Sequence, residues 1–413
     1  MRRIALIAVT ALAMGCSDVQ EFQLPGGPGG PAGALGPSTA SGDAVCGSDS
    51  DAHNCGVCGH SCLGGACAAG ACAPVRLASG QGDSAYGVPW YSYTTDIGDP
   101  LVGPDRLAVD DTHVYWLNLR GEVMRVPIAG GDAERIAKTA AAPAWIDLDD
   151  QFVYFSTLGA ELFRVPKSGG APVRLAPKVA QPRSGMAFLS SPSPFEFMLA
   201  AGQIYFANGN GIYACPSSGC VVAPAPIDEV YGDAVPFSFA IDATGRMYAS
   251  ESNARPDHGS TSTSGYAMTV FREGQWLGVS GSSAYYELKG GASEVYALTT
   301  SDFGTTGIVR WSESAVTFLA SGEALTGAPR GLTLDDDYVY WANAGENRID
   351  RLARTASVVR CKKTGCAAPE VLAGAQLTPR AVAVSKGAVY WTTGDGSVMK
   401  LAKPVAPGQR PLK

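Results

Sequence analysis

The sequence has few of the residues by which enzyme active sites are usually recognised. It contains only 4 histidines in 413 residues, and they form no cluster. It has no Gly-x-Ser-x-Gly nucleophile elbow, no His-Glu-x-x-His zinc motif and no glycine-rich phosphate loop. It also lacks a basic run, and its net charge of -7 argues against nucleic acid, because phosphate binding needs a basic face. We therefore predict no cofactor, no metal and no nucleic-acid partner.

The first apolar run is too short to cross a bilayer as a helix. Ile4–Met14 follows a charged start, and this combination predicts a secretory signal peptide at residues 1–15. The run ends in Ala-Met-Gly-Cys, which resembles the lipobox of bacterial lipoproteins and marks Cys16 as the lipidated residue, although the favoured leucine, Leu12, stands one place early. An ordinary signal peptide that is cut near Gly15 is the alternative.

The segment after Cys16 is rich in Gly, Pro, Ala and Ser and has too few apolar residues to form a core. Residues 16–45 are therefore predicted to be a lipidated, flexible tether. The predicted location is the cell envelope, with the lipid anchor as the only contact with the membrane. Ser17 after the lipidated residue favours the outer membrane over the inner one.

A cysteine-rich module at residues 46–72 follows the tether. An even number of cysteines in a short exported segment without a core predicts disulfides, but spacing alone leaves fifteen possible pairings. The alternative is a zinc or iron–sulfur site, since ligand spacings of two and three residues suit a metal, with His53 or His60 as a further ligand. In a disulfide module both histidines are expected to be solvated. The cysteines are Cys46, Cys55, Cys58, Cys62, Cys67 and Cys72.

A phrase of about forty to fifty residues recurs along the rest of the chain, which indicates a stacked or radial array. Each copy combines an alternating apolar segment, an Asp-rich turn, a Val-Tyr-Trp-like strand, an Arg-Val-Pro-like strand and a Gly-Gly turn. The clearest copies are Leu107–Lys138, Ile146–Pro177, Leu332–Ala373 and Val382–Lys403. Such a unit supplies the four strands of a propeller blade. Residues 73–413 are therefore predicted to form an all-β propeller.

The phase of the repeat predicts seven blades, although six or eight remain open. The blades start near Arg106, Trp145, Phe195, Phe237, Ser283, Gly331 and Ala381, and the fourth and fifth lack the aromatic signature. The strand Ala73–Ala78 repeats an outer strand with no inner strands before it, and the last copy stops before a clear fourth strand. We predict that the N-terminal strand completes the last blade and so removes exposed strand edges.

Two cysteine pairs lie at one phase of this repeat, on either side of a hairpin turn. Cross-strand positions beside a tight turn bring side chains close together, so these pairs are predicted to be hairpin disulfides: Cys215 with Cys220, and Cys361 with Cys366.

The repeated aromatic and acidic residues are interpreted as scaffold. Alternation along a strand puts neighbouring aromatics on opposite faces, where each packs against an adjacent blade; these are Tyr115-Trp116, Tyr154-Phe155, Tyr205-Phe206, Tyr340-Trp341 and Tyr390-Trp391. The acids lie between the first two strands of a blade, where a carboxylate bonds the amides of a tight turn; these are Asp110/Asp111, Asp149/Asp150 and Asp335/Asp336/Asp337. Catalysis by paired carboxylates would need two unlike environments, which a repeated position does not supply.

From about Cys46 onward the chain resembles exported bacterial β-propellers of the Tyr-Trp-Thr-Asp repeat class, which commonly carry such a Cys-Gly-rich leader. It departs from the receptor-type pattern because the fourth motif position here is usually Asn, Thr or Ser. The resemblance implies a protein-binding or extracellular scaffold module.

Departures from the repeat length locate the candidate binding residues. The entry loop Gly80–Pro104 and the insertion Ser252–Tyr266 both join the face of a propeller that carries the loops from second to third strands, and long loops are often functional. Aromatic anchors beside an Arg and a His suit recognition of a protein loop or a sugar, although the aromatics would equally fill the channel. The candidates are Tyr86, Trp90, Tyr91, Tyr93, Arg255, Asp257 and His258.

The sequence thus predicts a monomeric, envelope-anchored propeller that binds a protein or glycan and is not catalytic. The alternative is a propeller hydrolase or lyase with its site near Asp257 and His258, and a purely structural scaffold is a third possibility.

Overall fold

The chain divides into two compact units, Met1–Ala44 and Val45–Lys413. This computed structural model describes residues 47–81, 106–176, 196–252, 266–321, 329–343 and 356–405, with shorter gaps inside these ranges, and all of them belong to the second unit. None of the described segments forms a helix with the length and apolar character needed to cross a bilayer.

Within the described residues, the strands of the repeats pair into seven four-stranded antiparallel sheets, which we number I to VII in chain order. Sheets I to III are built as follows. Sheet I contains β4 (Leu107–Val109), β5 (His113–Asn118), β6 (Glu122–Pro127) and β7 (Glu134–Lys138). Sheet II contains β8 (Pro143–Leu148), β9 (Phe152–Thr157), β10 (Leu162–Pro166) and β11 (Val173–Arg174). Sheet III contains β12 (Phe197–Ala200), β13 (Gln203–Asn208), β14 (Gly211–Pro216) and β15 (Pro226–Glu229).

The remaining sheets follow the same order of strands, with one exception in the last. Sheet IV contains β16 (Val235–Ile241), β17 (Met247–Ser252), β18 (Tyr266–Arg272) and β19 (Gln275–Ser280). Sheet V contains β20 (Ser283–Gly290), β21 (Val295–Ser301), β22 (Thr306–Ser312) and β23 (Ala315–Ser321). Sheet VI contains β24 (Pro329–Leu334), β25 (Tyr338–Asn343), β26 (Ser357–Lys362) and β27 (Glu370–Ala373). Sheet VII contains β28 (Val382–Val384), β29 (Ala388–Thr392), β30 (Val398–Ala402) and β3 (Val75–Ala78).

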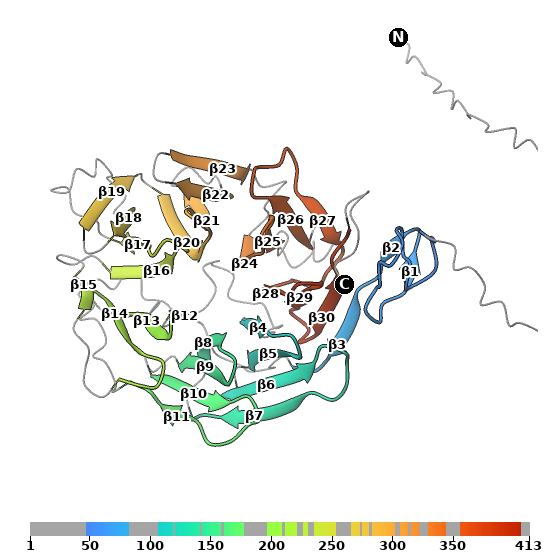
Figure 1. Cartoon of the computed structure of the whole chain (residues 1–413), viewed down its shortest axis with the longest axis horizontal. Helices are drawn as coiled ribbons and strands as arrows, with labels where there is room; N and C mark the ends of the chain where they lie inside the picture. The colour runs from blue at the N-terminus through green and yellow to red at the C-terminus, as the bar shows by residue number, and fades with distance from the viewer. Residues whose placement is uncertain are drawn as a thin grey trace, which may run out of the picture. The chain divides into compact units, whose positions relative to one another are not determined.

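The sheets stand around a common centre, so the prediction of an all-β propeller is confirmed. The first strand of each sheet faces the middle and the fourth lies outside (Figure 1). The fourth strand of sheet VII is β3, from the N-terminal end of the described chain, which pairs antiparallel with β30. This is the closure that the two incomplete fragments predicted.

The paired aromatics of the second strands form the core between neighbouring sheets. Trp116 packs with Ala388 and Tyr390 of sheet VII, whereas its neighbour Tyr115 packs with Ile146 and Phe155 of sheet II. Sheet VI repeats the arrangement, with Trp341 toward sheet V and Tyr340 toward sheet VII. Because successive side chains point to opposite faces of a strand, each such pair joins a sheet to both of its neighbours. This confirms the interpretation of the aromatics as scaffold.

The repeated acids are also structural. In sheets I, II and VI the first Asp of each turn accepts hydrogen bonds through both carboxylate oxygens. One oxygen accepts from backbone N–H groups of the turn, and the other accepts from the hydroxyl of the Tyr in the second strand. The hydroxyl bonds are Tyr115 to Asp110 (3.1 Å), Tyr154 to Asp149 (2.7 Å) and Tyr340 to Asp335 (2.6 Å). The fourth and fifth sheets, which the sequence suggested had lost the signature, keep the tyrosine: Tyr248 bonds Asp242 (3.2 Å) and Tyr296 bonds Glu294 (2.9 Å). These two tyrosines depart from the Tyr-Trp pattern because Ala follows each of them.

Replacing Tyr340 with Phe tests this turn. Lys403 and the Tyr340 hydroxyl both bond Asp335 and, despite its partial burial, hold the pKa of its carboxyl below the usual range. A carboxyl with a lowered pKa contributes stability above its unfolded-state pKa and loses it as the pH falls. We expect the variant to lose about 1–2 kcal/mol at pH 7 and progressively less below about pH 4. Urea unfolding across pH measures this; an equal loss at pH 3 and pH 7 would refute it.

Basic side chains link several sheets to the next one in the ring. From the third strand, Arg125 of sheet I reaches the Lys167 carbonyl of sheet II, Arg164 of sheet II reaches the Ser217 carbonyl of sheet III (2.9 Å), and Arg310 of sheet V reaches the Lys363 carbonyl of sheet VI (3.1 Å). Lys400 of sheet VII holds the corresponding place and donates to the Ile128 carbonyl of sheet I (2.8 Å). The last sheet is therefore bonded to the first by the same kind of contact that joins sheets I to II, II to III and V to VI.

Disulfides close two hairpins and hold the cysteine-rich module. Cys215 is bonded to Cys220 in sheet III and Cys361 to Cys366 in sheet VI. In the module, Cys55 is bonded to Cys67 and Cys62 to Cys72, around the short hairpin of β1 (Cys67–Ala68) and β2 (Ala71–Cys72). Cys58 is also disulfide-bonded, and Cys46 lies outside the described residues.

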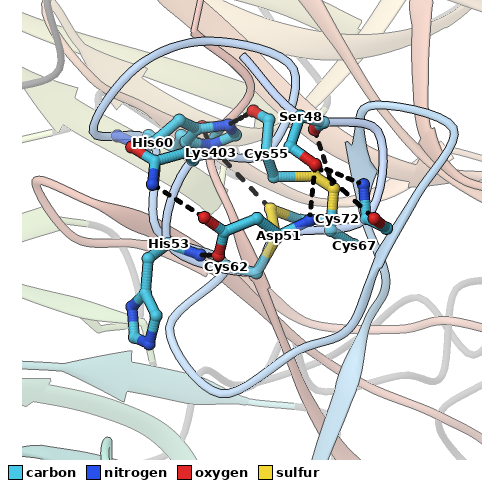
Figure 2. The surroundings of a disulfide bond; sticks show 11 residues. Ser48, Asp51, His53, Cys55, His60, Cys62, Cys67, Cys72 and Lys403 are labelled. Atoms are coloured by element: carbon cyan, nitrogen blue, oxygen red, sulfur yellow. Dashed lines mark hydrogen bonds between the residues drawn. A yellow bond between two sulfur atoms is a disulfide. The ribbon is translucent and has the colours of Figure 1, made fainter. Parts of the chain in front are cut away.

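The two histidines of the module differ in their surroundings (Figure 2). His53 is exposed, as the sequence led us to expect, but His60 is only 8% exposed, and its two ring nitrogens lie within hydrogen-bond distance of the Cys55 and Lys403 carbonyls. The expectation of a solvated His60 was wrong, because it rested on the module alone and the module packs against sheet VII.

Candidate functional site at the centre of the ring

Charged side chains and one indole meet at the first strands of four sheets. They lie in these strands or immediately before them, in sheets I, II, III and V, and they form what we call the central cluster: Arg106, Trp145, Asp147, Glu196, Glu287 and Lys289. Side chains two residues apart on a regular strand share a face, which puts Trp145 with Asp147.

Contacts within the cluster cross the middle of the ring. Arg106 of sheet I lies 4.0 Å from Glu287 of sheet V, measured from Nη1 to Oε1. The Arg106 guanidinium also stands 4.4 Å from the ring centroid of Trp145, and the Lys289 ammonium stands 5.2 Å from it. Sheets I and V, like sheets II and V, are separated by other sheets in the ring. The side chains of the central cluster therefore reach one another across the centre of the ring.

Glu287 reaches this position through a strained backbone. Its φ is +52°, a left-handed value that non-glycine residues rarely adopt, and it lies in a bulge of β20 opposite β21. Gly331, at φ +65° in the bulge of β24, shows the residue that such a kink ordinarily takes. The Glu287 carboxylate accepts the Leu332 N–H of sheet VI (2.7 Å). Strain of this kind costs about 1–3 kcal/mol and is enriched at functional sites.

The two other carboxyls of the cluster have raised pKa values. Burial raises the pKa of Glu196 to about 7, although Lys289, the Ser238 hydroxyl and Arg106 oppose the shift. Burial also raises the pKa of Asp147, which accepts backbone N–H groups from Leu199 (3.0 Å) and Leu148 (2.8 Å). The cluster thus holds a buried carboxyl with a raised pKa, Glu196, close to Arg106, Lys289 and Glu287. Such a set can hold a charged or hydrogen-bonding group of a ligand.

The cluster lies toward the end of the ring where one sheet connects to the next. In sheets II and IV the start of the first strand pairs with the end of the second, through Pro143 with Thr157 and Val235 with Ser252. The connection from the preceding sheet and the loop between the second and third strands therefore lie at the same end of each sheet. Arg106 and Glu196 stand immediately before β4 and β12, at this end.

None of the candidate binding residues from the sequence lies in the described part of the chain. Tyr86, Trp90, Tyr91 and Tyr93 precede Arg106, and Arg255, Asp257 and His258 follow β17. Cys16 is likewise outside the described residues. The roles assigned to these residues remain predictions.

The sequence did not point to the central cluster. Its only signal is that charged residues stand in first-strand segments that otherwise look apolar, as in Trp-Ile-Asp-Leu at residues 145–148 and Glu-Leu-Lys at 287–289. Among the described residues, the close set of potential metal ligands is Cys55, Cys62 and Cys72. Their sulfurs are engaged in disulfides, so the metal alternative for these cysteines is not supported.

Comparison with solved structures places the fold among β-propellers. The chain matches virginiamycin B lyase from Staphylococcus aureus with a TM-score of 0.55 and 13% identity, over 80% of this chain and 99% of the lyase. It matches YCF48 from Cyanidioschyzon merolae at 0.50 and 12%, over 80% and 98%, and the WD40 β-propeller domain of Doa1 at 0.50 and 11%, over 80% and 97%. At these identities the likeness shows the fold alone. No protein-family model and no curated protein matches the chain.

Proposed function

We propose that this protein is a binding β-propeller that holds a protein or glycan at the end of the ring that carries the central cluster, and that it is not catalytic. The observation that carries the proposal is the cluster itself: a strained Glu287, two cations and Trp145 are brought together from separate sheets. Trp and Arg are the residue types most enriched in binding hot spots. In this proposal the loops with Tyr86, Trp90, Tyr91, Tyr93, Arg255, Asp257 and His258, predicted from the sequence, extend the binding surface.

The described acids and histidines support binding over catalysis. Asp110, Asp149 and Asp335 are engaged in their turns and by tyrosine hydroxyls, so they do not form a free acid–base pair. Of the described histidines, His113 bonds Thr112 beside a turn, and His53 and His60 belong to the cysteine-rich module. A related propeller fold, YCF48, is known bound to the D1 peptide, which is the type of partner that we propose here.

We further propose that the protein is exported, lipidated on Cys16 and tethered to the cell envelope, with the outer membrane as the favoured location. The disulfides of the module and of the two hairpins support export, because disulfides persist in oxidising compartments. The chain is proposed to act as a monomer, and its sheets I to VII as a single seven-bladed ring.

Capture from envelope extracts tests the binding proposal. The bait is the unit Val45–Lys413, as wild type, as a Trp90→Ala, Tyr93→Ala and His258→Ala variant, and as the control Arg135→Ala on the exposed outer strand β7. We expect wild type and control to recover the same partner and the triple variant to bind the purified partner at least about tenfold more weakly, a loss of about 1.4 kcal/mol.

Melting curves of the three baits must agree, since a destabilised variant would show that the aromatics fill the channel. Equal partner binding by wild type and triple variant contradicts the proposed surface. Turnover of a substrate that depends on Asp257 or His258 would establish the hydrolase or lyase instead.

A further inference from the structure

The cysteine-rich module contacts the place where the first and last sheets of the ring meet. Lys400 on β30 is 3% exposed, and its ammonium donates to two carbonyls, that of Ile128 in sheet I (2.8 Å) and that of Leu63 in the module (2.5 Å). Burial lowers the pKa of Lys400, so the ammonium relies on these acceptors. One buried cation thus joins sheet VII, sheet I and the module.

His60 makes a second contact, on the other side of sheet VII. Its Nε2 lies 3.1 Å from the Lys403 carbonyl and its Nδ1 lies 2.8 Å from the Cys55 carbonyl (Figure 2). The ammonium of the same Lys403 bonds Asp335 of sheet VI (2.7 Å). Among the described residues, Arg360 of sheet VI bonds Glu370 of its own sheet and does not reach the next sheet as Arg164 and Arg310 do. His60 therefore contacts the residue after β30 whose side chain links sheet VII to sheet VI.

The module is joined to the closing strand by only two residues. Cys72 ends β2, and β3 begins at Val75. Cys72 packs against the cluster of Tyr340 and Trp391, between sheets VI and VII. Leu77 and Ala78 of β3 pack with Trp116 of sheet I. Any displacement of the module would therefore act directly on β3.

The module holds its shape through its disulfides. Of its described hydrophobic side chains only Cys55 and Cys62 are fully buried, and Cys72 is partly buried against sheets VI and VII. Its chain crosses itself closely, and a Cβ on Gly56 would lie 2.4 Å from the Gly70 carbonyl oxygen. Small segments without a core depend on disulfides for folding.

We propose that the disulfide-bonded module is a latch that keeps the ring closed, by fixing β3 and Lys400 at the junction of sheets VI, VII and I. A closing strand of four residues offers few backbone bonds, and here it pairs with β30 through a bulge. The module supplies the further bonds, from His60 and to Lys400, that hold this strand's sheet against both neighbours. The latch does not depend on the proposed binding function.

Hydrogen exchange on the full chain tests the latch, with three variants and one control. Lys400→Met keeps the apolar stem and removes the ammonium, His60→Ala removes the bond to the Lys403 carbonyl, and the pair Cys62→Ser and Cys72→Ser opens one module disulfide. The control, Cys215→Ser and Cys220→Ser, opens a hairpin disulfide far along the chain in sheet III.

We expect amide exchange in β3 and β30 to accelerate at least about tenfold in each of the three variants and to stay at the wild-type rate in the control. Faster exchange inside the module, with β3 and β30 unchanged, would overturn the latch and make the module an appended domain. If the double cysteine variant fails to fold, Lys400→Met and His60→Ala, which keep every disulfide, decide between the two results.

Discussion

Trp116→Ala is expected to lower the free energy of unfolding by about 3–5 kcal/mol, the range for removing a large aromatic from a packed core. Trp116 is fully buried and fills the space between sheets I and VII, where it touches both the closing strand and the first sheet. Its indole N–H has no hydrogen-bond partner among the described residues, so the loss is one of packing. Urea unfolding monitored by circular dichroism measures it.

Trp341→Ala is the matched comparison, because Trp341 occupies the same place between sheets V and VI and also donates to Asn343 (2.9 Å). Its loss should be at least as large. The control is Val371→Ala on β27, a residue 61% exposed, where the change should stay within about 0.5 kcal/mol. A near-zero cost at Trp116 would refute the assignment of these aromatics to the core between sheets.

Glu196→Gln is expected to stabilise the protein above pH 7 and to have little effect near pH 4. Burial raises the pKa of Glu196 from 4.5 to about 7, so the folded state binds this proton more tightly than the unfolded state. Folding therefore gains at low pH and loses as the pH rises from about 4.5 to 7. A shift of this size corresponds to about 3 kcal/mol at most, and Gln, which never ionises, removes it.

The measurement is the free energy of unfolding of wild type and variant between pH 4 and pH 9. Asp149→Asn supplies a control of opposite sign: the Tyr154 hydroxyl and the turn amides lower the pKa of Asp149, so its contribution is present at neutral pH and disappears in acid. Parallel curves for wild type and Glu196→Gln would show that Glu196 ionises alike in the folded and unfolded states and would remove the neutral-pH proton from the central cluster.

The sequence predicted those parts of the fold in which the interacting residues are close together along the chain. The Tyr–Asp turns lie within six residues of sequence, as with Tyr115 and Asp110, so their pattern is visible in the chain itself. Sheets IV and V lack the Tyr-Trp pair. The recurring structural unit is instead the tyrosine with the acid that it bonds, as with Tyr248 and Asp242. The two hairpin disulfides could also be predicted from the sequence, since the cysteines of each pair are only five residues apart.

The central cluster and the latch were not predictable in this way. Arg106 and Glu287 are far apart in the chain, and their approach depends on the order and curvature of the sheets between them. His60 looked like a loop residue because its partner, the Lys403 carbonyl, lies 343 positions away. The disulfide pairing of the module also required the structure, because spacing alone permits many pairings.

The sequence by itself determined the repeating strand unit, the scaffold role of the aromatics and acids, and the closure by an N-terminal strand, because each of these is encoded in local periodicity that recurs along the chain. Only the tertiary structure decided which charged side chains face one another across the ring and where the cysteine-rich module packs. These contacts join residues from separate sheets, and a linear pattern carries no information about which distant residues meet once the ring has closed.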